Sequence, residues 1–176
     1  MIYKSLKEIC EMALEGQIPF WKVIQRDDCT ERNVEESESF EQMRAMYRAM
    51  KHADEAYTGT RKSTSGMVGG DGKRLEQYVA EGKAMSGPFV GKVMERAVKM
   101  AESNACMRRI VAAPTAGSCG VLPAVLLTYA DQIDADEDKI VEALYTAAGI
   151  GQIIAHRASI SGAFGGCQAE IGSASA

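Results

Sequence analysis

The sequence predicts a mainly α fold: a single helical domain over residues 1–176 with three loops rich in Gly, Ser and Thr that carry its functional residues. Apolar residues recur at spacings of three and four along most of the chain, which is the period of one helix face. No segment sustains the every-second-residue alternation that half-buried strands show. Aromatic residues are few at 6%, whereas the ten methionines suit the irregular gaps between packed helices.

The first third of the chain contains three candidate helices. Apolar residues between Leu6 and Leu14 lie on one helix face, and Gly16 is the expected end. Residues 18–24 form a short apolar patch that fits a second small helix, although a strand also fits. Thr30 is the expected N-cap of the third helix. That helix carries a stripe that we expect to pack in the core, made of Phe40, Met43, Tyr47, Met50 and Tyr57.

The remaining helices follow a long irregular stretch over residues 58–72. Residues 75–79 predict a short helix closed by Gly82, and Ser86 and Pro88 mark the start of a strongly apolar helix that ends near residue 106. After the loop at residues 114–117, a helix is expected to continue to residue 133. Asp134 or Asp136 is expected to cap the next helix, which glycines at 149 and 151 should interrupt.

The bulk properties exclude several classes of protein. At 176 residues the chain is long enough for one domain with its own core. A net charge of −4 and the absence of basic runs argue against a nucleic-acid partner. The longest apolar run, residues 121–127, is far shorter than the ~20 residues of a membrane helix. No signal-peptide block opens the chain, so we expect a cytoplasmic protein that does not enter membranes.

Three loops concentrate the residues that chemistry needs. The segment 64–71 (TSGMVGGD) could cradle an anion or be a flexible linker, and it lacks the ending of a Walker loop. The segment 113–123 (APTAGSCGVLP) offers hydroxyls and backbone N–H groups ahead of a helix. This arrangement suits a bound carboxylate, but it also fits an ordinary capped helix start. The segment 159–176 is denser in glycine than a core requires, which indicates a close backbone approach.

The five cysteines are odd in number and widely spaced, which argues against a disulfide framework or a zinc ribbon. Cys167, flanked by glycines, is a candidate metal or cluster ligand, but a single thiolate does not hold a cluster. Cys119 is expected to be a packing residue. A cysteine hydrolase that pairs His156 with Cys119 or Cys167 is a remote alternative, since no third orienting residue is evident.

The three loops, together with the opening SLKEIC of residues 5–10, resemble the α chain of the iron–sulfur-dependent L-serine dehydratases over nearly the whole sequence. The resemblance implies conversion of L-serine to pyruvate and ammonia, with a 4Fe-4S cluster acting as a Lewis acid and Cys167 as one ligand. The substrate-binding residues that it implies are Thr64, Ser65, Gly66, Gly69, Gly70, Thr115, Ala116, Gly117, Ser118, Ser159 and Ser161.

The resemblance also implies a β chain as partner, a homo- or hetero-oligomer, and further cluster cysteines downstream of the residues present here. The family's α chain continues beyond this point, so we expect the isolated chain to be inactive, and a non-catalytic helical fragment is the alternative. Arg157 stands where the family more often has asparagine. The catalytic base is not identified.

Overall fold

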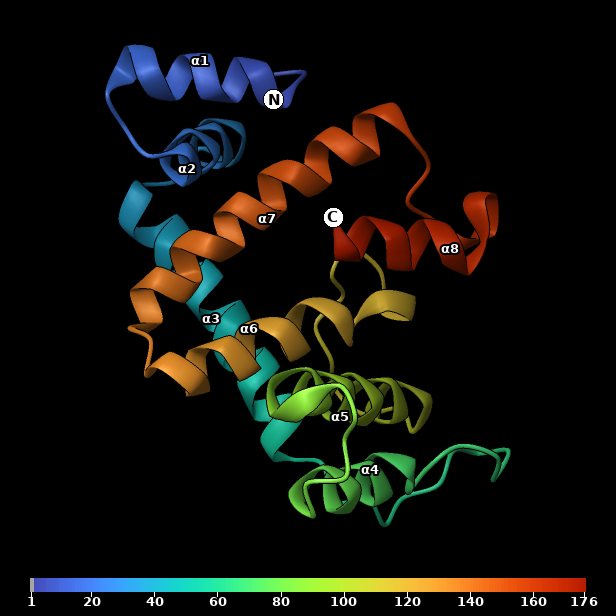
Figure 1. The fold of residues 1–176 in the computed structure, drawn as a ribbon. Coiled ribbons are helices and arrows are strands. Elements are labelled where there is room, and N and C mark those ends of the chain that lie inside the picture. Colours follow the sequence, from blue (N-terminus) through green and yellow to red (C-terminus); the bar gives the residue numbers. More distant parts are fainter. Residues whose placement is uncertain (1) are drawn as a thin grey trace.

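The structure is a computed structural model that describes residues 2–176 and, over them, contains eight α-helices and one short 3-10 helix (Figure 1). No β-strand occurs in this range, so the predicted fold class is confirmed. None of the helices so described combines the length and apolar character needed to cross a bilayer. The elements are α1 (Leu6–Gly16), α2 (Phe20–Arg32), α3 (Glu36–Glu55), α4 (Asp71–Ala80), α5 (Gly87–Ala105), η1 (Ala116–Ser118), α6 (Val121–Ile133), α7 (Glu137–Arg157) and α8 (Gly162–Ser175).

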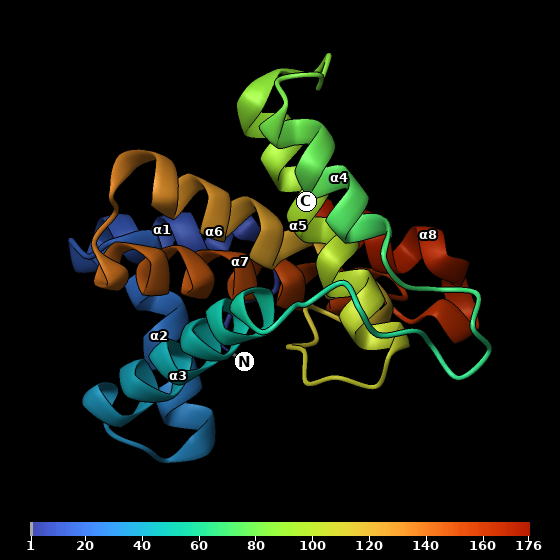
Figure 2. The ribbon, with the colours of Figure 1, turned by 90° about the horizontal axis from the view of Figure 1, so that it is seen from below.

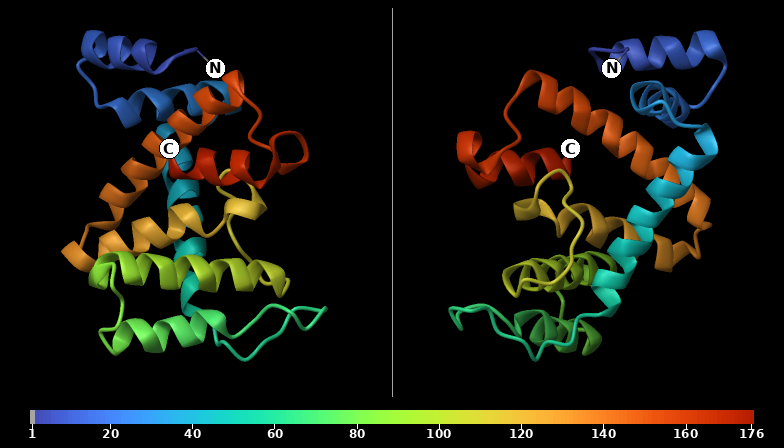
Figure 3. Two further views of the ribbon diagram at one scale, coloured as in Figure 1. Left: turned by 45° about the vertical axis from the view of Figure 1, so that its right-hand side comes forward. Right: turned by 180° about the vertical axis from the view of Figure 1, so that it is seen from behind.

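The helices are arranged between two ends of the molecule. The pair α1 and α2 lies at one end and the pair α4 and α5 at the other, with the long helix α3 running between them (Figures 1 and 3). Helix α7 crosses the molecule and packs on α2 and α3. After α7 the chain turns back, and α8 lies beside η1 and α6.

Two hydrophobic clusters form the core, and α7 contributes to both. Ile140 and Leu144 of α7 belong to a cluster shared with α3, α5 and α6, whereas Val141 and Tyr145 belong to one shared with α1 and α2. Because these pairs are adjacent in sequence, they point from α7 in different directions. Four members of the expected core stripe of α3 are buried or half-buried in these clusters: Phe40, Met43, Tyr47 and Met50. The prediction for the fifth, Tyr57, is wrong, because α3 ends at Glu55 and Tyr57 lies in the loop that follows.

The boundary predicted at Thr30 is wrong. Thr30 lies inside α2, where its hydroxyl donates a hydrogen bond of 2.8 Å to the carbonyl of Arg26, one helical turn earlier. Helix α2 continues because Val23 and Ile24 anchor it in the core, and it ends at Asn33 in the left-handed conformation that asparagine tolerates. Of the two aspartates offered as caps of α7, Asp136 is the N-cap.

The predicted interruption of α7 by its glycines is also wrong, because the helix is continuous from Glu137 to Arg157. Gly149 is buried where α7 meets α2. A Cβ atom there would lie 2.5 Å from Cγ1 of Ile24, so the glycine allows the two helices to approach closely. Gly151, on the same helix, faces open space.

This pair of glycines gives a matched test of helix packing. We expect Gly149→Ala to lower the free energy of unfolding by about 1–3 kcal/mol, since the added methyl group overpacks the contact with Ile24. We expect Gly151→Ala to raise it by about 0.5–1 kcal/mol, because alanine favours the helix and meets nothing. Urea unfolding followed by circular dichroism measures both, and changes of the same sign would contradict this account of α7.

Candidate functional site

The loop between α5 and α6 forms a tight turn around η1. The Ser118 hydroxyl is buried and donates to the carbonyl of Ala113 at 3.1 Å, while the backbone N–H of Thr115 donates to Ser118 Oγ at 3.4 Å. Asn104 of α5 holds the turn from outside through a 2.9 Å hydrogen bond to the Ala116 carbonyl. Ser118 therefore shapes the turn from within, whereas Ala116 and Gly117 are exposed.

The third predicted loop, residues 159–176, is largely not a loop, because Gly162–Ser175 form helix α8. Ser161 is its N-cap and accepts a hydrogen bond of 3.2 Å from the N–H of Ala163, whereas Ser159 is exposed just before it. Gly166 breaks the helix, with φ of 72° and ψ of 176°, a conformation that only glycine adopts readily. Cys167 follows this break, so its exposed thiol lies at the first turn of the second helical segment.

The structure brings these two predicted loops together. Helix α8 contacts η1, and at the junction lies the carboxylate of Glu170. A Cβ atom on Gly162 would lie 2.8 Å from Glu170 Oε2, and one on Gly117 would lie 2.9 Å from Oε1. The carboxylate therefore touches the backbone of both loops. Sequence reasoning gave Glu170 no role, although its position three residues after Cys167 on a helix places the two on one face.

The loop before α4 lies elsewhere. It overlaps α8 in the view of Figure 2, but Figures 1 and 3 show the two apart, with α5 between them. Its tip is a turn in which the N–H of Gly66 donates to the carbonyl of Ser63 at 2.8 Å. Thr64 and Ser65 are exposed, whereas Gly69 is buried and its carbonyl accepts from Lys62 Nζ at 2.5 Å. Gly70, in the left-handed region, precedes α4 as its N-cap.

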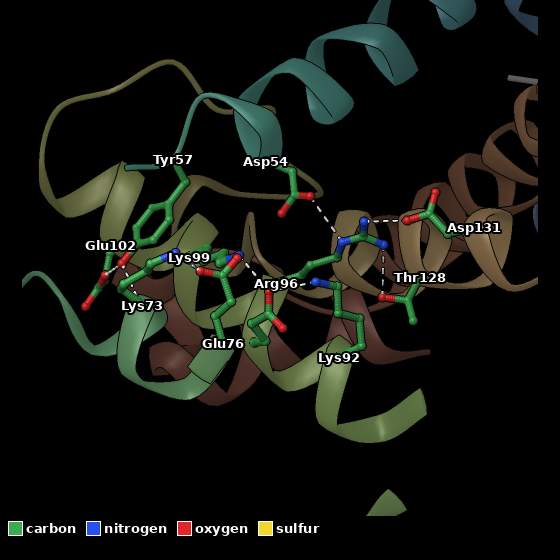
Figure 4. A network of polar contacts seen from close by, with 11 residues as sticks. Asp54, Tyr57, Lys73, Glu76, Lys92, Arg96, Lys99, Glu102, Thr128 and Asp131 are labelled. Carbon is green, nitrogen blue, oxygen red and sulfur yellow. Dashed lines mark hydrogen bonds and ion pairs between the residues drawn. The ribbon is translucent and has the colours of Figure 1, made fainter. Parts of the chain in front are cut away.

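Glu102 of α5 anchors this loop. Its carboxylate accepts a hydrogen bond from the Tyr57 hydroxyl (Figure 4). It also accepts hydrogen bonds from the backbone N–H groups of Gly70 at 3.2 Å and Asp71 at 2.7 Å. Burial acts to raise the pKa of Glu102, but these donors outweigh it, and the pKa is lowered overall. The carboxylate caps the N-terminus of α4 from another helix, where negative charge is favourable.

The rest of α5 buries a network of charges that sequence reasoning missed. Lys99 Nζ lies 2.6 Å from Glu95 Oε1 and 2.8 Å from Glu76 Oε1, with both Lys99 and Glu95 buried. Hydrogen bonds from Lys73 and Lys99 lower the pKa of Glu76 to about 2. Arg96, on the same helix, continues the polar contacts through bonds to Asp54, Thr128 and Asp131 (Figure 4). The sequence pattern that could have predicted this network is the spacing of charged residues three and four apart along α5.

Arg157, which departs from the resembled pattern, lies in the last turn of α7. Its guanidinium donates a 3.2 Å hydrogen bond to the carbonyl of Lys4, so it ties this end of α7 to the segment before α1. His156, beside it, is exposed and has no hydrogen bond to a cysteine within residues 2–176. The cysteine hydrolase alternative gains no support from this geometry.

The cysteines of the described range do not converge. Over residues 2–176, no three side chains of His, Cys, Asp or Glu lie together in a way that could hold a metal ion. Cys119 is a packing residue as expected, since it is buried beneath the carbonyl of Met100 and burial raises the pKa of its thiol. A four-iron cluster needs about three or four thiolates, so these residues alone do not fit that group.

Comparison with known proteins identifies the same family that the motifs resemble. The family model described as "Serine dehydratase alpha chain" matches residues 15–176. A probable L-serine dehydratase, alpha chain, from Bacillus subtilis (strain 168) is 38% identical over 99% of this chain, and an L-serine dehydratase, alpha chain, from Peptoniphilus asaccharolyticus is 36% identical over 98%. An L-serine dehydratase from Streptomyces coelicolor is 48% identical over 44% of this chain and 17% of its own length.

The alignments cover almost all of this chain but only part of its relatives. The chain spans 58% of the Bacillus protein and 59% of the Peptoniphilus protein. No solved structure matches the chain significantly. Since the family model covers all but the first 14 residues, the chain belongs to the serine dehydratase alpha chain family.

Proposed function

We propose that this chain supplies the alpha-chain part of an L-serine dehydratase, the enzyme that converts L-serine to pyruvate and ammonia. The observation that carries the proposal is the contact of α8 with η1, which unites two of the three motif loops around one carboxylate. Membership of the family supports the reaction class. The relatives named as dehydratases are longer than this chain, so the activity of the whole enzyme is part of the proposal.

The reaction is an elimination followed by hydrolysis. Loss of the α-proton and of the β-hydroxyl as water leaves aminoacrylate, which takes up water and releases ammonia to give pyruvate. In the proposed site, the turn at Thr115, Ala116, Gly117 and Ser118 binds the substrate carboxylate, with Ser159 and Ser161 beside it. The N–H of Ser118 is already bonded to Thr115, so the donors proposed for the anion are the N–H groups of the exposed residues Ala116 and Gly117. Orienting the substrate in this way lowers the entropic part of the barrier.

The loop with Thr64, Ser65, Gly66, Gly69 and Gly70 is proposed as a second substrate-binding element. Its base is fixed by Glu102, while its tip is exposed. Exposed tips on fixed bases are common positions for binding residues. Closing over a substrate at η1 requires movement of this loop or an approach by another chain.

Cys167 is proposed as one ligand of a 4Fe-4S cluster, and the other ligands come from outside the described residues. The exposed thiol at the break in α8 leaves room for an approaching group. Such a cluster supplies a Lewis acid for the hydroxyl when bound. A complementary β chain is proposed as the partner, and Phe164 of α8, 89% exposed, offers apolar surface for it.

Pyruvate formation from L-serine tests the function. The chain alone, with iron and sulfide under anaerobic conditions, is expected to form no pyruvate. Together with a β chain and the part of a relative's alpha chain that the alignment leaves uncovered, it is expected to form pyruvate. Cys167→Ala should abolish this activity, whereas Cys10→Ala, a matched exposed cysteine on α1, should not. Full activity in Cys167→Ala would contradict the ligand assignment, and absence of pyruvate under every condition would favour a non-catalytic fragment.

A further inference from the structure

The carboxylate of Glu170 is exceptional among the acidic side chains of this protein. Across residues 2–176, it is the one buried or half-buried carboxylate that has neither a hydrogen bond nor an ion pair. The more deeply buried carboxylates of α5 are satisfied: Glu95 by Lys92 and Lys99, and Glu102 by a hydroxyl and backbone N–H groups. A partly buried carboxylate loses some of its hydration, and without a donor that loss has no compensation. The carboxylate is therefore available to accept a hydrogen bond from a cationic group outside the described chain.

Two glycines keep space for this group. The carboxylate lies against Gly117 of the turn and Gly162 at the start of α8, where a Cβ atom on either residue would overlap with it. Neither Gly117 nor Gly162 has a positive φ, so the backbone conformation does not require glycine at these positions. The absence of side chains there is explained by the space that Glu170 takes. The contact also joins the carboxylate to both loops to which the substrate is assigned.

We propose that Glu170 binds the α-ammonium group of the amino-acid substrate. The inference rests on the proposed function and deepens it. A free amino acid carries an anionic and a cationic group on one carbon, so its site needs donors for the first and an acceptor for the second within a few ångströms. The turn at η1 and the carboxylate beside Gly117 provide that pair. Glu170 thereby selects amino acids over hydroxy acids of the same shape.

Binding of L-serine to the full chain, measured by titration calorimetry, tests the proposal. Glu170→Gln keeps the shape and removes the charge, and we expect it to weaken L-serine binding at least about tenfold, as expected for loss of a charge-assisted hydrogen bond. Gly117→Ala should weaken binding similarly, because its methyl group displaces the flexible end of Glu170. Gly172→Ala, on the same helix with nothing near its Cβ position, should bind as the wild type does.

Glycerate is the discriminating probe, because it keeps the carboxylate and hydroxyl of serine but has no ammonium group. The wild type is expected to prefer L-serine to glycerate strongly, and Glu170→Gln to lose most of that preference. Equal L-serine affinity in wild type and Glu170→Gln would overturn this proposal while leaving the proposed function intact. No L-serine binding by the wild type would contradict both. Binding of Mn²⁺ to the wild type that Glu170→Gln abolishes would also overturn it, by showing that the cation is a metal ion.

Discussion

Replacing Lys99 with methionine is expected to lower the free energy of unfolding by about 3–5 kcal/mol, the range for removing one partner of a buried ion pair. Lys99 is 7% exposed, and its ammonium group lies between the carboxylates of Glu95 and Glu76. Methionine retains most of the volume of the lysine side chain, so the loss of stability measures the effect of removing the charge. Glu95, 1% exposed, would then keep only the bond from Lys92.

The matched control is Lys92→Met, the same chemical change two helical turns away on α5. Lys92 Nζ contacts the same Glu95 oxygen at 2.8 Å, but its side chain is 39% exposed. We expect it to cost no more than about 1 kcal/mol, as exposed pairs do. Urea unfolding of both variants, followed by circular dichroism, makes the comparison. Equal losses would show that burial is not what makes the Lys99 pair important.

Glu102→Ala is expected to have the next largest effect, a loss of about 2–4 kcal/mol, because it leaves several partly buried donors without an acceptor. The N–H groups of Gly70 and Asp71 and the Tyr57 hydroxyl all depend on this carboxylate. The loop before α4 should also become susceptible to proteolysis, since its base is no longer held. Tyr57→Phe removes only one donor and should cost less, about 1 kcal/mol, without releasing the loop.

The pH dependence of stability provides a second test of the role of Glu102. The pKa of Glu102 is lower in the folded chain than its ordinary value of 4.5, so the folded state favours the charged form. Its contribution is therefore complete above that value and is lost as the pH falls below it. The difference in unfolding free energy between wild type and Glu102→Ala should shrink as the pH falls from neutrality to below 4. A difference that stayed constant with pH would argue against the carboxylate as the anchor.

Helix content and most helix ends could be predicted from the sequence because they depend on local pattern. Gly82 ends the α4 turn with a positive φ and Asp136 caps α7, as the residue types indicate. The errors at Thr30 and Gly149 share one cause, which is that tertiary contacts overrode a local signal. Ile24 is involved in both, since it anchors α2 in the core and meets Gly149 of α7.

The site was predictable in its parts but not in its assembly. The motif loops were recognisable by composition, yet only the turn at η1 and the start of α8 meet. Glu170 escaped notice because its significance depends on Gly117, which is distant in sequence. The sequence analysis noted only the apolar stripe of α5 and gave its charged residues no role, but α4 and α6 pack on that helix and several of these charges are buried.

Helix α8 has no fully buried residue, although it supplies Glu170 and Cys167. Little apolar surface is exposed when such a helix lifts away, so local opening costs much less than global unfolding. Anything that binds across Gly117 and Glu170 stabilises the docked position of α8 by mass action. Occupancy of the site and order in α8 are thus two measures of one equilibrium. Protection of the α8 amides from hydrogen exchange therefore reports ligand binding without any need for catalytic turnover.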